Sequence, residues 1–353
     1  MPMSNSFDIA FLKQALDGLP LISGDMPGIG GTIKSRPEHF QVEEILPYAP
    51  CGEGEHLYVT LRRKDWNTAD VARELADAFG CTSPEVGWGG RKDKRAFTTQ
   101  TFSIPVPVSA TLEESRARVE ALPFEILATR RHGNKIKTGH VAGNRFDVLI
   151  TGVQTDPVAR AKAIANRLKQ KGLPNFYGVQ RFGHQMGNLD QGLAILLSGR
   201  KARGRKSVFL VSAIQSALFN LWLRQRMENG QYGVILPGDI AKKTDTGGMF
   251  QVTDTQEAAQ RFEAHQIVYT GPIFGHKMKR AGETAGIAED SLLGGFGLTL
   301  AHFKRLRAGG TRRAAILYPD DLEMAPSEQG LRLRFTLPAG AYATTLLREF
   351  TRP

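Results

Sequence analysis

A lone carboxylate among cations is the feature of this chain that could do chemistry. Asp93 is surrounded by four basic residues, which are Arg91, Lys92, Lys94 and Arg95. Because nearby positive charge favours the ionised form of a carboxyl group, we expect Asp93 to be an anion at neutral pH. A carboxylate anion can attack or stabilise an electron-poor carbon, or abstract a proton. The stretch therefore indicates either a catalytic acid or a solvated charged turn, which is what such loops usually are.

The segments on either side of Asp93 predict a tight loop between two extended segments. Gly87, Gly89 and Gly90 precede it, and three glycines within four residues indicate a sharply turning backbone or the close approach of another group. An alternating run over residues 99–104 follows it and predicts a strand. This combination favours a functional loop over an ordinary surface turn.

Two other stretches predict strands that could carry site residues. Residues 32–45 predict a strand, a proline turn and a second strand with Phe40, Val42 and Ile45 on its buried face. Residues 143–150 predict a strand that is entered through a glycine.

Periodicity and capping signals predict the remaining elements. Helices are expected at 7–19, 68–79, 111–122, 157–171, 207–229 and 256–265, and strands at 56–64, 124–129, 238–243 and 331–337. Thr68 is predicted to cap its helix and Gly80 to end it. The strand at 331–337 alternates without a break and is the clearest one in the chain.

The size and composition are those of a soluble globular protein. The chain has 353 residues, enough for two domains with a substantial core. No apolar run approaches the roughly 20 residues of a membrane span, and residues 1–8 lack a signal-peptide pattern. Cys51 and Cys81 alone make neither a zinc site nor a disulfide framework. We therefore expect a cytoplasmic protein without a membrane partner.

The net charge of +11 indicates a polyanionic partner, most simply nucleic acid, although basic proteins without such a partner are not rare. Clusters of cations occur at residues 130–137, 199–206 and 304–313. The cluster at 130–137 is predicted either to contact phosphates or to form a solvated loop. The chain contains no phosphate-binding, zinc-protease or dinucleotide motif, so neither a metal nor an organic cofactor is expected, and no protein partner is evident.

Residues 172–183, Gly-Leu-Pro-Asn-Phe-Tyr-Gly-Val-Gln-Arg-Phe-Gly, resemble the most specific signature of the tRNA pseudouridine synthase D (TruD) family. Ten defined positions match over twelve residues, which makes coincidence a poor explanation. Residues 90–94 resemble the family's Gly-x-Lys-Asp-[Lys/Arg] loop, which carries the nucleophilic aspartate. Three further motifs match in order, within residues 32–45, at 143–146 and at 337–349. The family usually has Phe where this chain has Tyr342.

The resemblance implies an α+β fold, the pseudouridine synthase catalytic domain, with a mixed, largely antiparallel sheet and flanking helices. It implies that residues 1–174 and 319–353 form the catalytic domain and that residues 175–318 form an inserted α/β TRUD domain. The activity implied is that of an isomerase, an intramolecular transferase that converts uridine to pseudouridine in tRNA, with position 13 as the usual target.

The resemblance also assigns site residues. Asp93 would be the catalytic nucleophile, and either Lys34 or another basic neighbour would pair with it; the sequence does not decide which. The substrate-binding residues implied are Lys34, Phe40, Glu43, Lys92, Asn144, Phe146, Arg181 and Tyr342.

Two other functions fit parts of the sequence. A non-catalytic RNA-binding protein explains the charge but not the placement of Asp93 after a glycine turn. A tRNA methyltransferase would need a nucleotide-cofactor loop that leads into a helix, whereas residues 87–90 lead into a strand.

Overall fold

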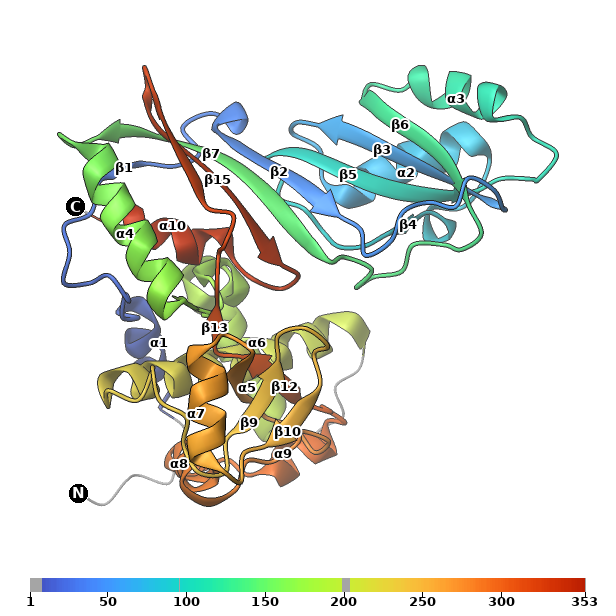
Figure 1. Ribbon diagram of the computed structural model, residues 1–353. Coiled ribbons are helices and arrows are strands. Elements are labelled where there is room, and N and C mark those ends of the chain that lie inside the picture. Colours follow the sequence, from blue (N-terminus) through green and yellow to red (C-terminus); the bar gives the residue numbers. More distant parts are fainter. Residues whose placement is uncertain (1–7, 95, 199–203, 353) are drawn as a thin grey trace. The chain divides into compact units, whose positions relative to one another are not determined.

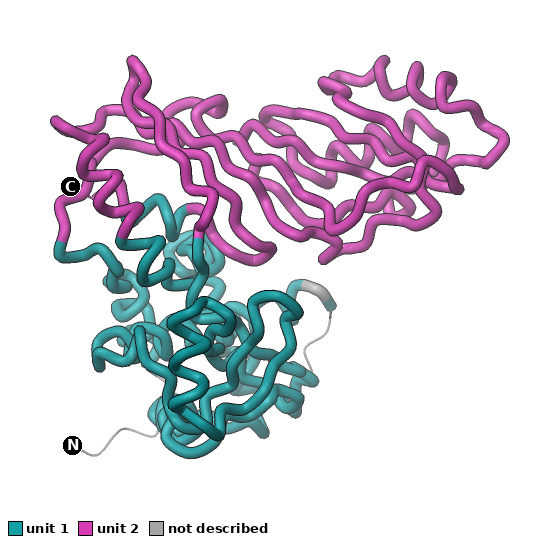
Figure 2. The backbone as a smooth tube through the Cα atoms, viewed as in Figure 1, with its two compact units in different colours: residues 1–25, 167–318, 344–349 teal, residues 26–166, 319–343, 350–353 magenta. Residues whose placement is uncertain are grey.

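The computed structural model describes residues 8–94, 96–198 and 204–352 as an α+β protein (Figure 1). The chain divides into two compact units, which Figure 2 distinguishes by colour. Unit 2 contains residues 26–166, 319–343 and 350–353, and unit 1 contains residues 1–25, 167–318 and 344–349. Arg95 and most of the 199–206 basic cluster lie outside the described residues. The predicted inserted domain falls within unit 1, and its assignment as a separate domain stays a prediction.

Unit 2 is built on one large sheet. Among the described residues it has nine strands, of which seven follow the order β14-β15-β7-β2-β5-β3-β6, while β1 pairs with β7 and β4 with β5. Among the strand pairs that the described part of the chain forms in this sheet, only β2–β5 is parallel. The strands are β1 Gly30–Thr32, β2 Phe40–Ile45, β3 His56–Arg63, β4 Gly87–Trp88, β5 Phe97–Pro105, β6 Glu125–His132, β7 Gly143–Val153, β14 Glu323–Ser327 and β15 Gly330–Pro338. The predicted mixed, largely antiparallel sheet is confirmed.

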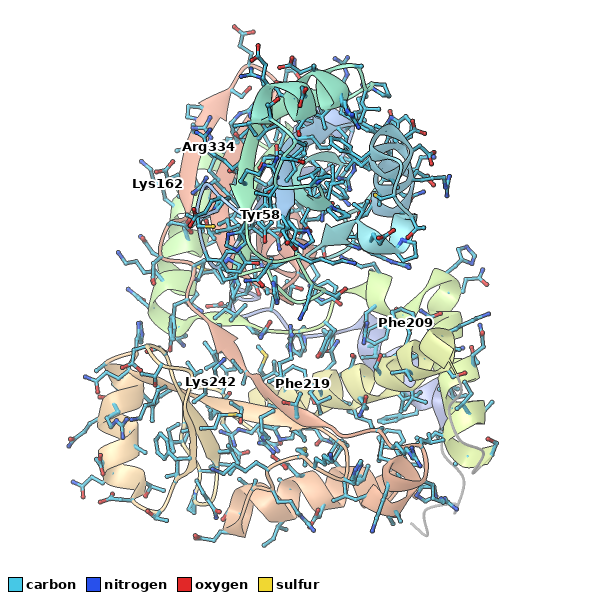
Figure 3. The ribbon with its side chains drawn as sticks, turned by 90° about the vertical axis from the view of Figure 1, so that its right-hand side faces the viewer. Tyr58, Lys162, Phe209, Phe219, Lys242 and Arg334 are labelled. Atoms are coloured by element: carbon cyan, nitrogen blue, oxygen red, sulfur yellow. The ribbon has the colours of Figure 1, made fainter. Side chains whose placement is uncertain are left out.

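Strand alternation places the core of unit 2 on one face of this sheet. Leu61 of β3 and Phe102 of β5 are fully buried there, and Val71 and Leu75 of helix α2 belong to the same hydrophobic cluster. The helical segments of this unit are η1 Pro37–His39, α2 Thr68–Phe79, η2 Ser83–Glu85 and α3 Leu112–Glu120. Tyr58 on β3 and Arg334 on β15 can be followed in Figure 3.

Unit 1 packs helices around a smaller sheet. Its four strands are all antiparallel neighbours, in the order β10-β9-β11-β12, and a two-stranded pair joins β8 to β13. The helical segments are α1 Ile9–Asp17, η3 Val179–Phe182, η4 His184–Met186, α5 Gly187–Ser198, α6 Gly204–Glu228, α7 Thr255–Glu263, α8 Glu283–Gly295 and α9 Leu300–Arg305. The strands are β8 Leu173–Pro174, β9 Ile240–Lys243, β10 Met249–Gln251, β11 Ile267–Ile273, β12 Thr311–Ala314 and β13 Ile316–Leu317. Helices α4 Pro157–Lys171 and α10 Ala343–Thr351 each contain residues of both units.

Helix α6 is the core helix of unit 1. Its inward residues include Ile214, Leu218 and Trp222, as the 3.6-residue periodicity predicts, together with Phe219, which is labelled in Figure 3. Among the described helices, the segment Lys206–Glu228 is long and apolar enough to cross a membrane, but 72% of its most apolar window is buried inside the protein. Burial of this kind is typical of a core helix.

Two local predictions are wrong, and one helix was not predicted. Helix α2 is capped by Asn67, whose side-chain oxygen accepts hydrogen bonds from the backbone N–H groups of Ala69 and Asp70. Thr68 is instead the first helical residue. On β2 the third buried position is Glu44, not Ile45, because strand residues alternate between faces. Helix α5 follows the 172–183 signature and was not predicted, since glycines interrupt its pattern.

Candidate active site

The Asp93 carboxylate lies on the loop of a hairpin. Strands β4 and β5 pair antiparallel, and residues 89–96 connect them, as the sequence predicts. The Nζ atom of Lys34 lies 2.7 Å from Oδ2 of Asp93, with 30% of the lysine side chain and 49% of the aspartate side chain exposed. Of the candidates that the sequence left open, Lys34 is thus a residue that pairs with Asp93. A positive charge at this distance stabilises the carboxylate as an anion, and solvent can still reach it.

Lys34 is held in a conformation that lysine seldom adopts. Its φ angle of 60° lies in the left-handed region, which costs a residue with a side chain on the order of 1–3 kcal/mol. Its ammonium also lies 4.3 Å from the centre of the Phe40 ring, within the range of a cation–π contact. Backbone strain of this kind often accompanies a functional site, and here it directs the ammonium to Asp93.

Aromatic rings line the sheet beside this ion pair. The ring centres of Phe40 and Phe146 are 6.1 Å apart in an edge-to-face arrangement, and Phe146 stacks on Phe335 at 5.2 Å. The register explains this, because Phe146 on β7 lies opposite Phe335 on β15. Both Phe40 and Phe146 are buried, so the structure brings the predicted aromatic residues together as part of the core.

A row of polar side chains crosses the same face of the sheet beneath the Asp93 loop. Asn144 of β7 lies opposite Glu44 of β2, and Glu44 accepts a hydrogen bond of 3.1 Å from Gln100 of β5. The Oε1 atom of Gln100 then accepts a hydrogen bond of 3.0 Å from Arg63 of β3. Three of the four, all except Asn144, are buried on a largely apolar face, which is where a polar side chain is most informative.

The loop is anchored to this row. The ammonium of Lys92 forms a very short ion pair with the buried carboxylate of Glu44, and the backbone N–H of Lys92 donates to the Thr68 hydroxyl at 3.0 Å. The carbonyl of Gly90 accepts a hydrogen bond of 2.7 Å from Gln100. Burial lowers the pKa of Arg63 to about 10, against the opposing effect of Glu44, so Arg63 keeps its charge at neutral pH.

Two of the predicted substrate-binding residues form ion pairs with other described residues, and their roles in binding substrate stay predictions. Glu43 is exposed on the opposite face of β2, where it pairs with Arg145 at 3.0 Å. The family motif in this stretch is Lys-x-x-Pro-Glu-x-Phe-x-Val-x-Glu, and counted from Lys34 its last glutamate is Glu44 rather than Glu43. The Lys92 ammonium pairs with the buried Glu44 carboxylate, which requires a counter-charge. The Lys92 ammonium is therefore turned away from solvent.

Asn144 lies on β7, and Tyr342 lies just after β15, the strand that pairs with β7. Asn144 is half-buried, and its Oδ1 atom accepts no hydrogen bond from any described residue. Leu337 of β15 lies opposite Asn144, and Tyr342 follows five residues later as the residue before helix α10. The roles predicted for both side chains remain predictions.

Arg181 belongs to unit 1. Its guanidinium donates to the hydroxyls of Ser212 at 2.6 Å and Ser216 at 3.2 Å, and lies over the ring of Phe209 at 4.9 Å. No ion pair with Arg181 occurs within residues 8–94, 96–198 and 204–352. Its charge is therefore not neutralised by a described carboxylate.

The basic turn at 130–137 is divided between structural and exposed cations. The guanidinium of the buried Arg131 donates to three backbone carbonyls, and the Lys135 ammonium donates to the carbonyl of Pro84. Arg130 and Lys137 are exposed. Only these two of its four cations fit the prediction of a phosphate-contacting turn.

Close packing explains the glycines before Asp93. A Cβ atom on Gly87 would lie 2.3 Å from the carbonyl oxygen of Ile136 and 2.4 Å from the hydroxyl of Ser103. At Gly90 the nearest atom would be 3.9 Å away, at the end of the Lys92 side chain. The run of glycines therefore allows the 135–141 segment to approach the hairpin, and Gly90 is not required for space.

We predict that Gly87→Ala destabilises the protein by about 1–3 kcal/mol, because backbone must move to admit the methyl group. Gly90→Ala is the matched control and should change the free energy of unfolding by less than about 0.5 kcal/mol. Urea unfolding followed by circular dichroism measures both. Equal stability of the two variants would contradict the packing argument.

Four residues of the site were not predicted from the sequence, namely Glu44, Gln100, Arg63 and Thr68. A signal for three of them was present, because Glu44 shares the strand face of Val42, Gln100 that of Phe102, and Arg63 that of Leu61. A polar residue at an apolar position of a strand indicates a buried polar contact. Nothing in the local pattern identifies Thr68, whose hydroxyl meets Lys92 of the loop.

Comparison with known proteins places the chain in a family. The family model of tRNA pseudouridine synthase D (TruD) matches residues 18–198 and 205–350. A relative with that name from Anaeromyxobacter dehalogenans is 42% identical over 343 residues, covering 95% of this chain and 96% of its own, and one from Thermus thermophilus is 42% identical over 333 residues, covering 94% and 91%. A crystal structure of a Methanosarcina mazei protein described as tRNA pseudouridine synthase D aligns with a TM-score of 0.74 at 23% identity, covering 99% of this chain and 98% of that one, which shows the same fold. The chain therefore belongs to the tRNA pseudouridine synthase D (TruD) family.

Proposed function

We propose that this protein isomerises uridine to pseudouridine in tRNA, at position 13, with Asp93 as the catalytic nucleophile. The observation that carries the proposal is the Asp93 carboxylate, half-exposed on an anchored hairpin loop and paired with the Lys34 ammonium at 2.7 Å. Family membership supports the reaction type, and the geometry supports the choice of residue.

The reaction is an isomerisation, so no atom is gained or lost overall. The bond between N1 of uracil and C1′ of ribose breaks, the ring turns, a bond forms between C5 and C1′, and the proton on C5 is released while N1 gains one. An anionic carboxylate suits the first step, since it can attack the electron-poor C1′ carbon, stabilise the positive charge that develops there, or remove a ribose proton. The Lys34 ammonium holds this carboxylate in place through the 2.7 Å ion pair.

The uridine must leave its base stack to reach Asp93, at a cost of a few kcal/mol. We place its ring against Phe146 and Tyr342, near Phe40, because base–aromatic contact is worth roughly 1–3 kcal/mol per base. Asn144 would orient the ring or the carboxylate. Its buried Oδ1 atom, without a partner among the described residues, suits the N3–H donor of uracil.

The tRNA backbone would be bound by exposed cations, which read no bases. The net charge of +11 supports a polyanionic partner, and Arg181 is a candidate because no described carboxylate neutralises it. We also assign residues 175–318 as the inserted TRUD domain of the family and place the enzyme in the cytoplasm, where tRNA is modified.

The test is the modification state of tRNA. Cells that lack this protein should lose one pseudouridine, at position 13, as measured by nucleoside mass spectrometry and carbodiimide mapping, and the purified protein should restore it. An unchanged modification map, together with no product from the purified protein, would overturn the proposal.

Lys34 provides a graded prediction. Lys34→Met should lower kcat by about 10²-fold, because the charge that stabilises the Asp93 anion is lost. Lys34→Arg should retain more activity, since a cation remains within reach. Pseudouridine formation under single-turnover conditions compares the two variants, and equal rates would show that the positive charge has no role.

A further inference from the structure

Gln100 stands out in unit 2 because it is a fully buried amide at the centre of the polar row. Its two N–H donors go to the carbonyl of Gly90 at 2.7 Å and to the Glu44 carboxylate at 3.1 Å. Its oxygen accepts from Arg63 at 3.0 Å and from the Thr68 hydroxyl at 3.4 Å. A side-chain amide has two donors and two acceptor lone pairs, so all four are used.

Chemistry determines how this amide is oriented. A carbonyl and a carboxylate only accept hydrogen bonds, and a guanidinium only donates them, so the NH₂ group of Gln100 must face Gly90 and Glu44. No charged side chain of similar size satisfies both sides. A glutamate would place a second carboxylate beside Glu44 and would have no donor for the Gly90 carbonyl when ionised.

The contacts of Gln100 converge on the backbone before Asp93. The Gly90 carbonyl is three residues before the carboxylate, and the Lys92 N–H is held by the hydroxyl of Thr68, to which Gln100 is itself hydrogen-bonded. The Lys92 side chain is held by Glu44, the other acceptor of Gln100. Residues 90 and 92 are therefore fixed from beneath, and Asp93 then extends to Lys34 on the solvent side.

We infer that Gln100 is a positioning residue for Asp93: its amide fixes the loop so that the carboxylate is held in one place beside Lys34. The inference rests on the proposed function for its kinetic consequence and on the structure alone for its effect on the loop. It predicts that changes at Gln100 act on the chemical step rather than on tRNA binding, because a displacement of about 1 Å can cost about 10²-fold in rate.

The kinetic experiment compares Gln100→Glu and Gln100→Ala with the unmodified protein. Both variants should lower kcat by about 10- to 100-fold at pH 8, with the Kd for tRNA and KM changed by less than about threefold. For Gln100→Glu, kcat should rise as the pH falls, because the protonated carboxyl is neutral and regains one donor. The groups that face it are Glu44 from β2, Arg63 from β3 and Lys92 from the loop, and of these the Glu44 carboxylate raises its pKa.

Gln215→Glu is the matched control. Gln215 is also buried, on α6 of unit 1, and its amide also donates to a backbone carbonyl, that of Phe274 at 2.6 Å. If burying a carboxyl only lowers the stability of the protein, Gln215→Glu should show that lower stability, but its kcat should not depend on pH in the way expected for Gln100→Glu. Thr68→Val tests the same loop with an uncharged side chain of similar shape, and Thr68→Ser, which keeps the hydroxyl, should restore kcat.

A readout independent of activity is amide hydrogen exchange of the 88–94 peptide. Gln100→Ala and Thr68→Val should speed exchange there by about 10-fold or more, while peptides from β15 remain as slow as in the unmodified protein. Unchanged exchange in this peptide, or a kcat at pH 8 equal to that of the unmodified protein, would overturn the inference. If the unmodified protein forms no pseudouridine, the proposed function fails, and the exchange result still decides whether Gln100 positions the loop.

Discussion

Asp93→Asn should abolish pseudouridine formation, lowering kcat on the order of 10³-fold or more. The amide has nearly the same shape as the carboxylate, so Lys34, the hairpin and the underlying polar row should keep their places. What is lost is the negative charge that attacks or stabilises C1′. Because tRNA binding depends on cations elsewhere, the Kd for tRNA should change by less than about threefold.

The measurement is single-turnover release of tritium from tRNA labelled at C5 of uridine, together with a filter-binding assay for tRNA. Asp190→Asn is a closely matched control. Asp190 pairs with Lys13 at the same 2.7 Å, and the exposed fractions of the two side chains, 30% for the lysine and 50% for the aspartate, nearly equal those of the Lys34–Asp93 pair. Full activity in Asp93→Asn would leave only an RNA-binding protein.

Arg226→Gln should destabilise the protein by about 3–5 kcal/mol, the largest effect on stability that we expect from a single ion pair. The guanidinium of Arg226 forms a two-pronged contact with Asp239 at 3.1 and 3.2 Å, and the two side chains are only 4% and 1% exposed. It also lies over the ring of Tyr269 at 4.2 Å. Removing it leaves a carboxylate buried without its counter-charge, and desolvation of that charge has no other compensation of equal size.

The cost of Arg226→Gln should depend on pH. Burial already raises the pKa of Asp239 against the opposing effect of Arg226, and without the arginine the pKa rises further. A carboxyl with a raised pKa in the folded state stabilises the protein below its unfolded pKa, and this stability is lost as the pH rises through the folded value. The variant should therefore be closer to the unmodified protein at pH 5 than at pH 8.

Urea unfolding at both pH values, followed by circular dichroism, measures this. Arg261→Gln is the control, because Arg261 pairs with an exposed carboxylate, that of Glu257, of which 65% of the side chain is accessible. Its loss should cost less than about 1 kcal/mol. An equal loss of unfolding free energy in the two variants would show that burial of the Arg226–Asp239 pair does not determine how much the pair stabilises the protein.

Local pattern was sufficient wherever the determining contacts lie within one element. The alternation of residues 331–337 predicts β15 and its buried face, and the periodicity of residues 207–229 predicts α6 with the correct inward residues. The same reasoning places Asp93 on a loop after a glycine turn and before a strand. These features depend on neighbours within a few positions, so the linear order contains the required information.

Local pattern was insufficient where two candidates were adjacent or where the partner is distant. Thr68 and Asn67 are both good capping residues, and only the packing of the Thr68 hydroxyl against Arg63 and the loop separates their roles. At positions 43 and 44 a shift of one residue exchanges the two faces of the strand, so placing the motif glutamate at Glu43 selected the exposed side chain.

What the sequence by itself determined is the kind of chemistry: an acid in a basic, glycine-preceded loop, in a chain whose ordered motifs belong to one family. Only the tertiary structure decided which cation meets that acid. Lys34 and Asp93 are 59 positions apart, and Lys92, its immediate neighbour, turns instead to Glu44. The physical reason is that a buried carboxylate requires a nearby cation. Which cation is nearest depends on strand register and loop closure rather than on order along the chain.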